Sequence, residues 1–256
     1  MSDSIVVSAD QVSIGHRSST PRLDHVSVSI RSGRVHAFVG PNGSGKSTLL
    51  AVLAGDLPPD SGTVLIQGRP WSSHSPASAA RLRALLAQDV PLAFAFTVRE
   101  VVSWGRLPWR GSDTDDDAIL TEAIAQNRLE ELLDRTVPSL SGGERARVHL
   151  ARVMAQQTPL LMLDEADAAL DLAGQAHLDD AIHRRRSRGE TTVLVSHDLA
   201  RVAAVADEVT VLDRGRVVAQ GPTSDILTAE KLSVSYGVPV RDGEVGDRRH
   251  FWVAGD

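Results

Sequence analysis

The chain contains no cysteine and only two lysines, Lys46 and Lys231, among its 256 residues. The absence of cysteine excludes disulfides, iron–sulfur ligation and thiol catalysis, and it is typical of a reducing compartment. No apolar run approaches the ~20 residues that span a bilayer, and residues 1–4 lack the basic and apolar parts of a signal peptide. We therefore expect a cytoplasmic protein with no direct membrane insertion.

A strongly basic surface is absent as well. The net charge is −6 and the sequence pI is about 5.8, so we predict no nucleic-acid partner. The densest basic run, Arg184–Arg186 with Arg188, ends a predicted helix beside Gly189, where arginine suits a helix C-terminus. Asp113–Asp117 gather acid at the start of another predicted helix, and we interpret them as its first turn rather than as a metal site.

One nine-residue stretch organises the chain, between a predicted buried strand at Val35–Val39 and a predicted helix at residues 48–54. It fits the phosphate-loop pattern G-x-x-x-x-G-K-[ST] with the residues Gly40, Pro41, Asn42, Gly43, Ser44, Gly45, Lys46, Ser47 and Thr48. Glycines let successive N–H groups curl around a polyphosphate, and the helix N-terminus favours an anion. Lys46 would reach the β- and γ-phosphates and Ser47 would sit on Mg²⁺. An ordinary glycine-rich turn is the alternative, but Lys-Ser at the helix start favours a nucleoside triphosphate site.

The order of apolar segments predicts an α/β fold with a parallel core sheet. Apolar runs of strand length, flanked by helical segments, indicate strands buried on both faces. Residues 76–87 follow helical periodicity, residues 89 to about 155 look mainly helical, and 238–256 are predicted to form a hairpin across Asp242-Gly243. The predicted strands are Ile5–Val7, Gln11–Ile14, Val26–Ile30, Val35–Val39, Thr63–Ile66, Leu160–Leu163, Thr191–Val195 and Glu208–Leu212.

Two carboxylates, Asp164 and Glu165, follow the apolar run Leu160–Leu163. A parallel strand delivers such residues at its C-terminal edge, where α/β sheets bind ligands. Asp164 suits Mg²⁺, directly or through water, and Glu165 is placed to polarise an attacking water. Standing alone, the pair would more simply cap the next helix. Together with a phosphate loop it favours hydrolysis.

The segment Leu140–Glu144 opens a further predicted helix, which runs to about Gln157. Ser141 is a helix N-cap with Glu144 at the third helical position, as in a capping box. Gly142 and Gly143 allow close approach, and the free N–H groups there can bind an anion. The spacing alone says only that a second phosphate site is possible.

These motifs occur in the order found in ATP-binding cassette (ABC) ATPases, which the chain resembles over nearly its whole length. The Leu-Ser-Gly-Gly-Glu segment is highly specific to that family. The resemblance implies a P-loop NTPase with a parallel core sheet and an antiparallel β subdomain at 1–88 and 156–237, an inserted helical subdomain at about 89–155, and a tail at 238–256. The motifs are Gly40–Ser47, Gln88, Leu140–Glu144, Asp164-Glu165, Leu170-Asp171 and His197-Asp198.

The resemblance also implies roles for these residues. Two copies would sandwich two ATP molecules, each held between one subunit's phosphate loop and the other's Ser141-Gly142-Gly143. Gln88 would sense Mg²⁺ and the nucleophilic water, and Glu165 would act as general base. His197 would contact the γ-phosphate, and Asp171 would cross the dimer interface.

The chain departs from the family where an aromatic residue usually stacks on adenine. Ile14 and His16 are the candidates here. A stacking contact is worth about 1–3 kcal/mol on nucleic-acid bases, so we expect a weaker or less selective base contact.

Residues 91–102 and 105–111 resemble importer ATPases for iron chelates and cobalamin, especially the haem importer ATPases of actinobacteria. That resemblance implies a homodimer beneath two permease subunits, with an extracellular binding protein, at the cytoplasmic face of the membrane. Ordinary packing of Phe94, Phe96 and Trp104 is compatible with it, because an apolar groove there could receive a permease helix. Ferric-siderophore or cobalamin import and a soluble, non-transport ABC ATPase are the alternatives. A guanine-nucleotide switch would need an Asn-Lys-x-Asp motif, which the two lysines do not allow.

Overall fold

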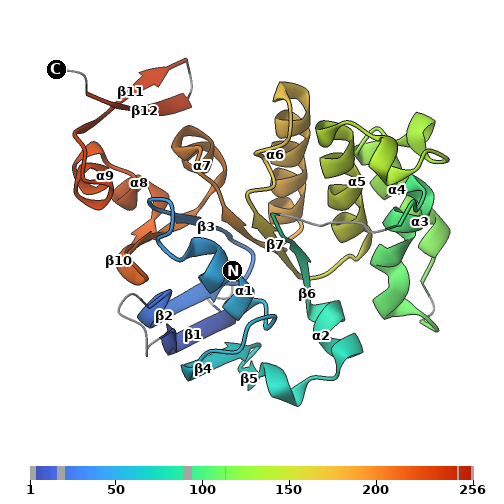
Figure 1. Cartoon of the computed structure of the whole chain (residues 1–256), viewed down its shortest axis with the longest axis horizontal. Coiled ribbons are helices and arrows are strands. Elements are labelled where there is room, and N and C mark those ends of the chain that lie inside the picture. The colour runs from blue at the N-terminus through green and yellow to red at the C-terminus, as the bar shows by residue number, and fades with distance from the viewer. Residues whose placement is uncertain (1–3, 16–20, 89–93, 113, 247, 255–256) are drawn as a thin grey trace. The chain divides into compact units, whose positions relative to one another are not determined.

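The computed structural model describes residues 4–15, 21–88, 94–112, 114–246 and 248–254 (Figure 1). The chain divides into two compact units. The first unit comprises Met1–Ser73 with Arg185–Asp256, and the second comprises His74–Arg184. The sequence-based boundaries of a helical subdomain at about 89–155 and a tail at 238–256 stay a prediction.

The first unit contains an antiparallel sheet with the strand order β2-β1-β4-β5. In β2, Val26, Val28 and Ile30 are buried, as its alternating pattern predicts. The prediction of two short strands at 5–7 and 11–14 was wrong, because both belong to one strand. Gln11, with a left-handed φ of 50°, lies at a register shift that interrupts the ladder without ending it. The strands are β1 (Ile5–Ile14), β2 (Leu23–Arg31), β4 (Ser61–Ile66) and β5 (Arg69–Pro70).

Apolar strands in the first unit form the parallel part of its core. β3 (Val35–Val39) pairs in parallel with β8 (Thr191–Val195) and with β9 (Glu208–Asp213). Every residue of β3 and β8 is buried, which confirms the expectation drawn from their apolar runs. Helix α1 (Lys46–Leu53) follows β3 after the phosphate loop, and α7 (Leu199–Val205) follows β8. β10 (Arg216–Pro222) pairs antiparallel with β9.

The C-terminal part of the first unit consists of two short helices and a hairpin. They are α8 (Thr223–Ile226), α9 (Ala229–Tyr236), β11 (Val240–Val245) and β12 (Arg248–Val253). The hairpin was expected, but its turn does not lie at Asp242-Gly243. Asp242 pairs with Phe251 inside the ladder and its carboxylate forms an ion pair with Arg249, so β11 continues to Val245.

In the second unit the predicted helix 76–87 was wrong in its second half. Helix α2 (Pro76–Leu82) ends at Leu82, and Arg83–Leu86 form strand β6 instead. β6 pairs in parallel with β7 (Leu160–Asp164), and Ala84 and Leu86 turn inward while Arg83 and Leu85 are half-buried. Pairing with a buried strand overrides a helical preference over so few residues.

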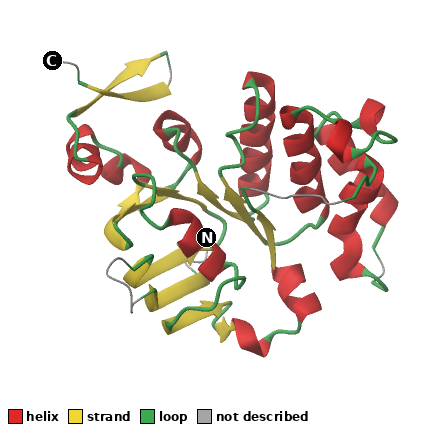
Figure 2. Cartoon of the chain, viewed as in Figure 1, coloured by secondary structure: helices red, strands yellow, loops and turns green. Residues whose placement is uncertain are grey.

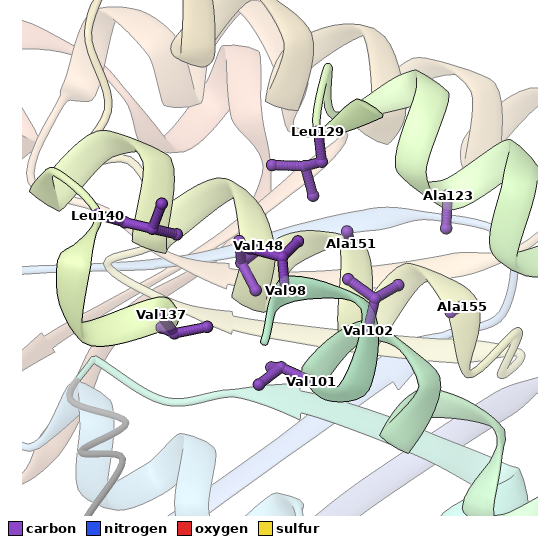
Figure 3. Close-up of a cluster of buried hydrophobic side chains, with 10 residues drawn as sticks. All are labelled: Val98, Val101, Val102, Ala123, Leu129, Val137, Leu140, Val148, Ala151 and Ala155. Carbon is purple, nitrogen blue, oxygen red and sulfur yellow. The ribbon is translucent and has the colours of Figure 1, made fainter. Parts of the chain in front are cut away.

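Most of the second unit is helical (Figure 2), and its helices between residues 98 and 155 supply or contact one apolar cluster (Figure 3). Phe96 and Trp104 pack against it edge to face, with ring centroids 4.8 Å apart. This cluster fixes the start of α5, where the Ser-Gly-Gly segment lies. The helices are α3 (Val98–Ser103), η2 (Trp104–Trp109), α4 (Asp116–Gln126), η3 (Glu130–Leu132), η4 (Val137–Ser139) and α5 (Gly142–Ala155), and α6 (Leu172–Ser187) begins in this unit. The cluster comprises Val98, Val101, Val102, Ala123, Leu129, Val137, Leu140, Val148, Ala151 and Ala155.

The acidic residues at the start of α4 serve its structure, as expected. The Asp115 carboxylate accepts a hydrogen bond from the Ala118 N–H at 3.0 Å and caps the helix. Asp116 accepts from the Nε of the buried Arg106 at 2.7 Å. Among the described residues, which leave out Asp113, no group of three or more acidic, His or Cys side chains could hold a metal. No described helix is long and apolar enough to cross a bilayer.

Candidate functional site

The phosphate loop has a backbone that requires glycine at two positions. Gly40 adopts φ 140° and Gly45 adopts φ 103°, both in the region that L side chains rarely enter. A Cβ on Gly40 would lie 2.0 Å from the Leu212 carbonyl oxygen, and one on Gly45 would lie 2.6 Å from that of Arg22. The loop is therefore packed tightly against backbone on its outer side.

Lys46 is buried at the start of α1, with 5% of its surface exposed. Its ammonium donates hydrogen bonds to the carbonyl oxygens of Gly40 and Pro41, each at 3.0 Å. Ser44 is also buried, and its hydroxyl has no partner among the described residues. A buried ammonium and an unpartnered hydroxyl on one glycine loop fit a bound anion, because both gain charged or strongly accepting partners from it.

The other loop residues surround this centre. Asn42 and Gly43 are exposed, and a Cβ on Gly43 would meet open space. Ser47 and Thr48 occupy the first turn of α1, where backbone N–H groups lack helical partners. Asn42 and Gly43 are therefore the exposed part of the loop.

His197 lies at the same sheet edge as the phosphate loop. β3 and β8 run in parallel with Phe38 opposite Val195, and these paired residues lie two positions before Gly40 and His197 respectively. His197 is exposed, and the neighbouring Asp198 caps α7 by accepting from the Arg201 N–H at 3.0 Å. The structure therefore brings together two predicted site residues that are far apart in sequence.

In the second unit, Asp164 ends β7 and Glu165 follows it. Asp164 is 8% exposed, and Glu165 adopts a left-handed φ of 50°, which is uncommon for a non-glycine residue. The Gln88 side-chain Nε2 donates to Glu165 Oε2 at 2.6 Å. The two residues, 77 positions apart in sequence, therefore form a direct pair. Backbone in such an uncommon region is often found at functional sites.

These side chains line a cavity of about 540 Å³ within the second unit. Its polar lining comes from the ends of β6 and β7 and from the first turns of α5. The residues with polar or charged side chains are Gln88, Arg145, His149, Asp164 and Glu165, and Gly142 adds backbone. Leu86 and four alanines complete the wall.

His149 was not selected from the sequence, although Gly142, Arg145 and His149 follow helical spacing along one face of α5. The side chain is buried, and neither ring nitrogen has a partner among the described residues. Burial lowers the pKa of His149 to about 4, and the charges of Arg152 and Arg145 act in the same direction. The imidazole is therefore neutral at physiological pH.

Replacing His149 with Gln is expected to weaken the dependence of stability on pH. The unfolded imidazole titrates near 6.5 and the folded one near 4, so the unfolded chain binds more protons between these values. The free energy of unfolding therefore falls as pH drops through this window. Between pH 7.5 and pH 5, the free energy of unfolding measured by chemical denaturation should fall by up to about 2 kcal/mol more in the wild type than in the variant. Equal losses would contradict the assignment, since the other histidines are common to both proteins.

The Leu140–Glu144 segment forms the predicted capping box at the start of α5. The Ser141 Oγ accepts from the Glu144 N–H at 3.3 Å, and Glu144 Oε2 accepts from the Ser141 N–H at 2.8 Å. These bonds from Ser141 lower the pKa of Glu144. Ser141, Gly143 and Asp171 line a second cavity of about 200 Å³ with Glu144, Arg147 and Leu170. The structure thus joins Asp171 to the Ser-Gly-Gly segment within one subunit.

One predicted base contact was wrong. Ile14 is 5% exposed and pairs with Leu23 inside the antiparallel sheet, so its side chain is not available to a nucleotide base. Val12, Ser13 and Ile14 are all buried, so the pairing of β1 with β2, rather than alternation along the strand, accounts for this burial. The other candidate, His16, lies outside the described residues.

A groove of about 350 Å³ lies on the helical part of the second unit. Phe96, Trp104 and Leu107 supply its apolar wall, and Glu100, Arg110 and Asp116 contribute charge. Phe94, next to this region in sequence, is 70% exposed. Residues 91–93 of the importer-like segment lie outside the described residues.

Comparison with known proteins places these features in a family context. The model described as "ABC transporter" matches residues 23–168. The "Hemin import ATP-binding protein HmuV" of Thermobifida fusca is 45% identical over 241 residues, which are 93% of this chain and 84% of that protein. The "Cobalamin import ATP-binding protein BtuD" of Halobacterium salinarum is 40% identical over 86% of this chain and 56% of that protein. A solved structure of a transporter described as metal-chelate type, in an inward-facing conformation, matches 98% of both chains with a TM-score of 0.81 and 25% identity.

Proposed function

This chain belongs to the ABC transporter family, and we propose that it is the ATPase subunit of a haem importer. It is an ABC-type, ATP-binding ATPase. The observation that carries the haem assignment is the 45% identity to a hemin import ATP-binding protein over 93% of this chain. Residues 91–102, which resemble the corresponding segment of haem importer ATPases, support the same substrate.

We propose that the phosphate loop binds the ATP phosphates in this importer. The Lys46 ammonium would exchange its bonds to the Gly40 and Pro41 carbonyl oxygens for bonds to phosphate oxygens. The Ser44 hydroxyl, which has no partner among the described residues, and the backbone N–H groups of the first turn of α1 would add further donors. His197, at the same sheet edge, would contact the γ-phosphate.

For Mg²⁺, the chain offers the hard oxygen donors that this ion prefers. They are the Ser47 hydroxyl, the Gln88 amide oxygen and the Asp164 carboxylate. Bound Mg²⁺ supplies charge stabilisation to the transferring phosphoryl group. The residue types therefore fit the metal that the family implies.

Glu165 would act as the general base for water. Gln88 Nε2 holds one oxygen of its carboxylate at 2.6 Å, which fixes the orientation of the group. A carboxylate held in this way is positioned to accept a proton from water without first searching for its geometry. We assign Gln88 to positioning and Glu165 to proton transfer.

We further propose that two copies of the chain work together. Ser141, Gly142 and Gly143 begin α5 and their exposed end offers N–H donors to the phosphates of the ATP bound by the partner copy. Asp171, which lines the adjacent cavity, would cross the dimer interface. The site of each copy is incomplete without the other.

The groove around Phe96, Trp104 and Leu107 is the surface proposed to meet the permease. An apolar floor with charged edges suits an amphipathic helix. The proposed assembly has two permease subunits and an extracellular binding protein. The ATPase would then lie at the cytoplasmic face of the membrane through the permease, without insertion of its own.

Import of a cobalamin or of a ferric siderophore is the second candidate. It is favoured by one observation, the 40% identity to a cobalamin import ATP-binding protein, but that match covers only 56% of the relative. A soluble, non-transport ABC ATPase is supported less, since the relatives named above are both import ATP-binding proteins.

Growth on defined iron sources tests the substrate. A strain that lacks this protein is expected to lose growth on haemin as sole iron source and to keep growth on a ferric siderophore. The wild-type gene should restore growth on haemin and a Glu165→Gln gene should not, because transport requires hydrolysis. Loss of growth on the siderophore alone would contradict haem as the substrate, but it would not contradict the proposed ATPase mechanism.

Uptake of radiolabelled haemin and cobalamin in the same strains provides the matched control. Under the proposal only haemin uptake falls when the gene is deleted. Loss of cobalamin uptake with unchanged haemin uptake would favour the second candidate.

A further inference from the structure

The single tyrosine of the chain, Tyr236, contacts the phosphate loop. It is the last residue of α9, and its hydroxyl accepts a hydrogen bond from the Gly40 N–H at 3.2 Å. The two residues are 196 positions apart, and both belong to the first unit. Gly40 is the residue at which β3 passes into the loop.

Both backbone polar groups of Gly40 are held in this structure. Tyr236 binds its N–H, and the Lys46 ammonium binds its carbonyl oxygen at 3.0 Å. When Lys46 turns to a phosphate, the carbonyl loses that partner. The bond to Tyr236 is the one that can persist through the change.

Helix α9, which carries Tyr236, is held in place by burial and by side-chain hydrogen bonds. Leu232 of α9 is fully buried, and the Thr228 hydroxyl caps the helix by accepting from the Lys231 N–H at 3.3 Å. The Ser233 Oγ accepts from the Val240 N–H at 2.8 Å and so ties α9 to β11. Burial raises the pKa of Tyr236, so the hydroxyl stays neutral at physiological pH.

We propose that Tyr236 is a positioning residue for nucleotide binding, which holds Gly40 and with it the start of the phosphate loop. The proposal rests on the function proposed for residues 40–48. Gly40 has a backbone that only glycine adopts readily, and glycine loses more conformational freedom on ordering than any other residue. A tether that orders it before ATP arrives removes part of the entropic cost of binding. Tyr236 does not touch the reacting atoms, so the chemical step does not depend on it.

Tyr236→Phe removes only the hydroxyl and tests this directly. We expect the KM for ATP and the Kd measured by ATP titration to rise about three- to tenfold, the effect of one net hydrogen bond, while kcat stays within about twofold. Hydrogen exchange at the Gly40 amide should become faster in the variant without nucleotide. A residue that only stabilised the fold would not split KM from kcat in this way.

Ser233→Ala is the matched control. It removes a hydroxyl from the same helix and the bond to Val240 without touching the phosphate loop. We expect a lower melting temperature with an unchanged KM and unchanged exchange at Gly40. An equal rise of KM in both variants would overturn the proposal, since it would trace the effect to α9 as a whole.

An unchanged KM and an unchanged Gly40 exchange rate in Tyr236→Phe would also overturn it. Failure of the phosphate-loop assignment is distinguishable, because then Lys46→Ala would leave ATP binding unchanged as well. Weak ATP binding in Lys46→Ala with normal binding in Tyr236→Phe would reject only the role of Tyr236.

Discussion

Replacing Glu165 with Gln is expected to lower the kcat for ATP hydrolysis about 10²–10⁴-fold, the usual contribution of a general base. In the wild type, Gln88 Nε2 donates to Glu165 Oε2 at 2.6 Å. The glutamine of the variant has the same size and keeps an oxygen that can accept this hydrogen bond. It loses the ability to take a proton. The measurement is steady-state phosphate release by the purified subunit at saturating ATP and Mg²⁺.

The same variant should still bind ATP and should accumulate as a dimer. Hydrolysis normally ends the ATP-bound state, so its loss leaves two copies joined through ATP. Light scattering coupled to size exclusion, with and without ATP, measures this shift. Hydrolysis at the wild-type rate would remove Glu165 as the base.

Glu100→Gln is the matched control for this experiment. Glu100 closes the capping box of α3 by accepting from the Thr97 N–H at 2.7 Å, and a glutamine oxygen can accept the same bond. It makes the same chemical change in the same unit, away from the carboxylate pair. Its hydrolysis rate should match the wild type, so a loss in both variants would indicate a general effect of removing negative charge.

Much of the chemistry could be predicted because it lies in contiguous motifs. The phosphate loop needs glycines, a lysine and a helix start in one short run, and Gly40 and Gly45 prove to be packed against backbone oxygens. The buried strands β3 and β8 were found because a strand covered on both faces must be apolar throughout.

What the sequence could not predict depends on partners distant in the chain. Arg83–Leu86 look helical by themselves and become a strand only because β7 offers a ladder. The buried state of Ile14 follows from its sheet neighbour Leu23, and no local pattern distinguishes it from a strand-end contact to a base. Tyr236 meets Gly40 across 196 positions, which no periodicity spans.

Replacing Lys46 with Ala is expected to weaken ATP binding about 10- to 150-fold. That range corresponds to about 1.5–3 kcal/mol for hydrogen bonds to a charged group. Lys46 is buried and already directs its ammonium to two loop carbonyl oxygens, so the loop also loses its internal closure. The side chain that replaces it can reach neither the loop nor a phosphate.

The ATP-induced rise in melting temperature measures this loss of ATP affinity. It is taken relative to the same protein without ATP, so a change in the variant's own stability does not affect it. Ligand that binds only the folded state stabilises by mass action, so a fixed ATP concentration should raise the wild-type melting temperature and barely move that of Lys46→Ala. Lys231→Ala is the control, because Lys231 is the only other lysine and its ammonium donates to the Asp225 carbonyl at 2.7 Å on the exposed surface of the first unit. Its ATP-induced rise should equal the wild type. An equal rise in Lys46→Ala would contradict the assignment of residues 40–48 as the loop that binds the ATP phosphates.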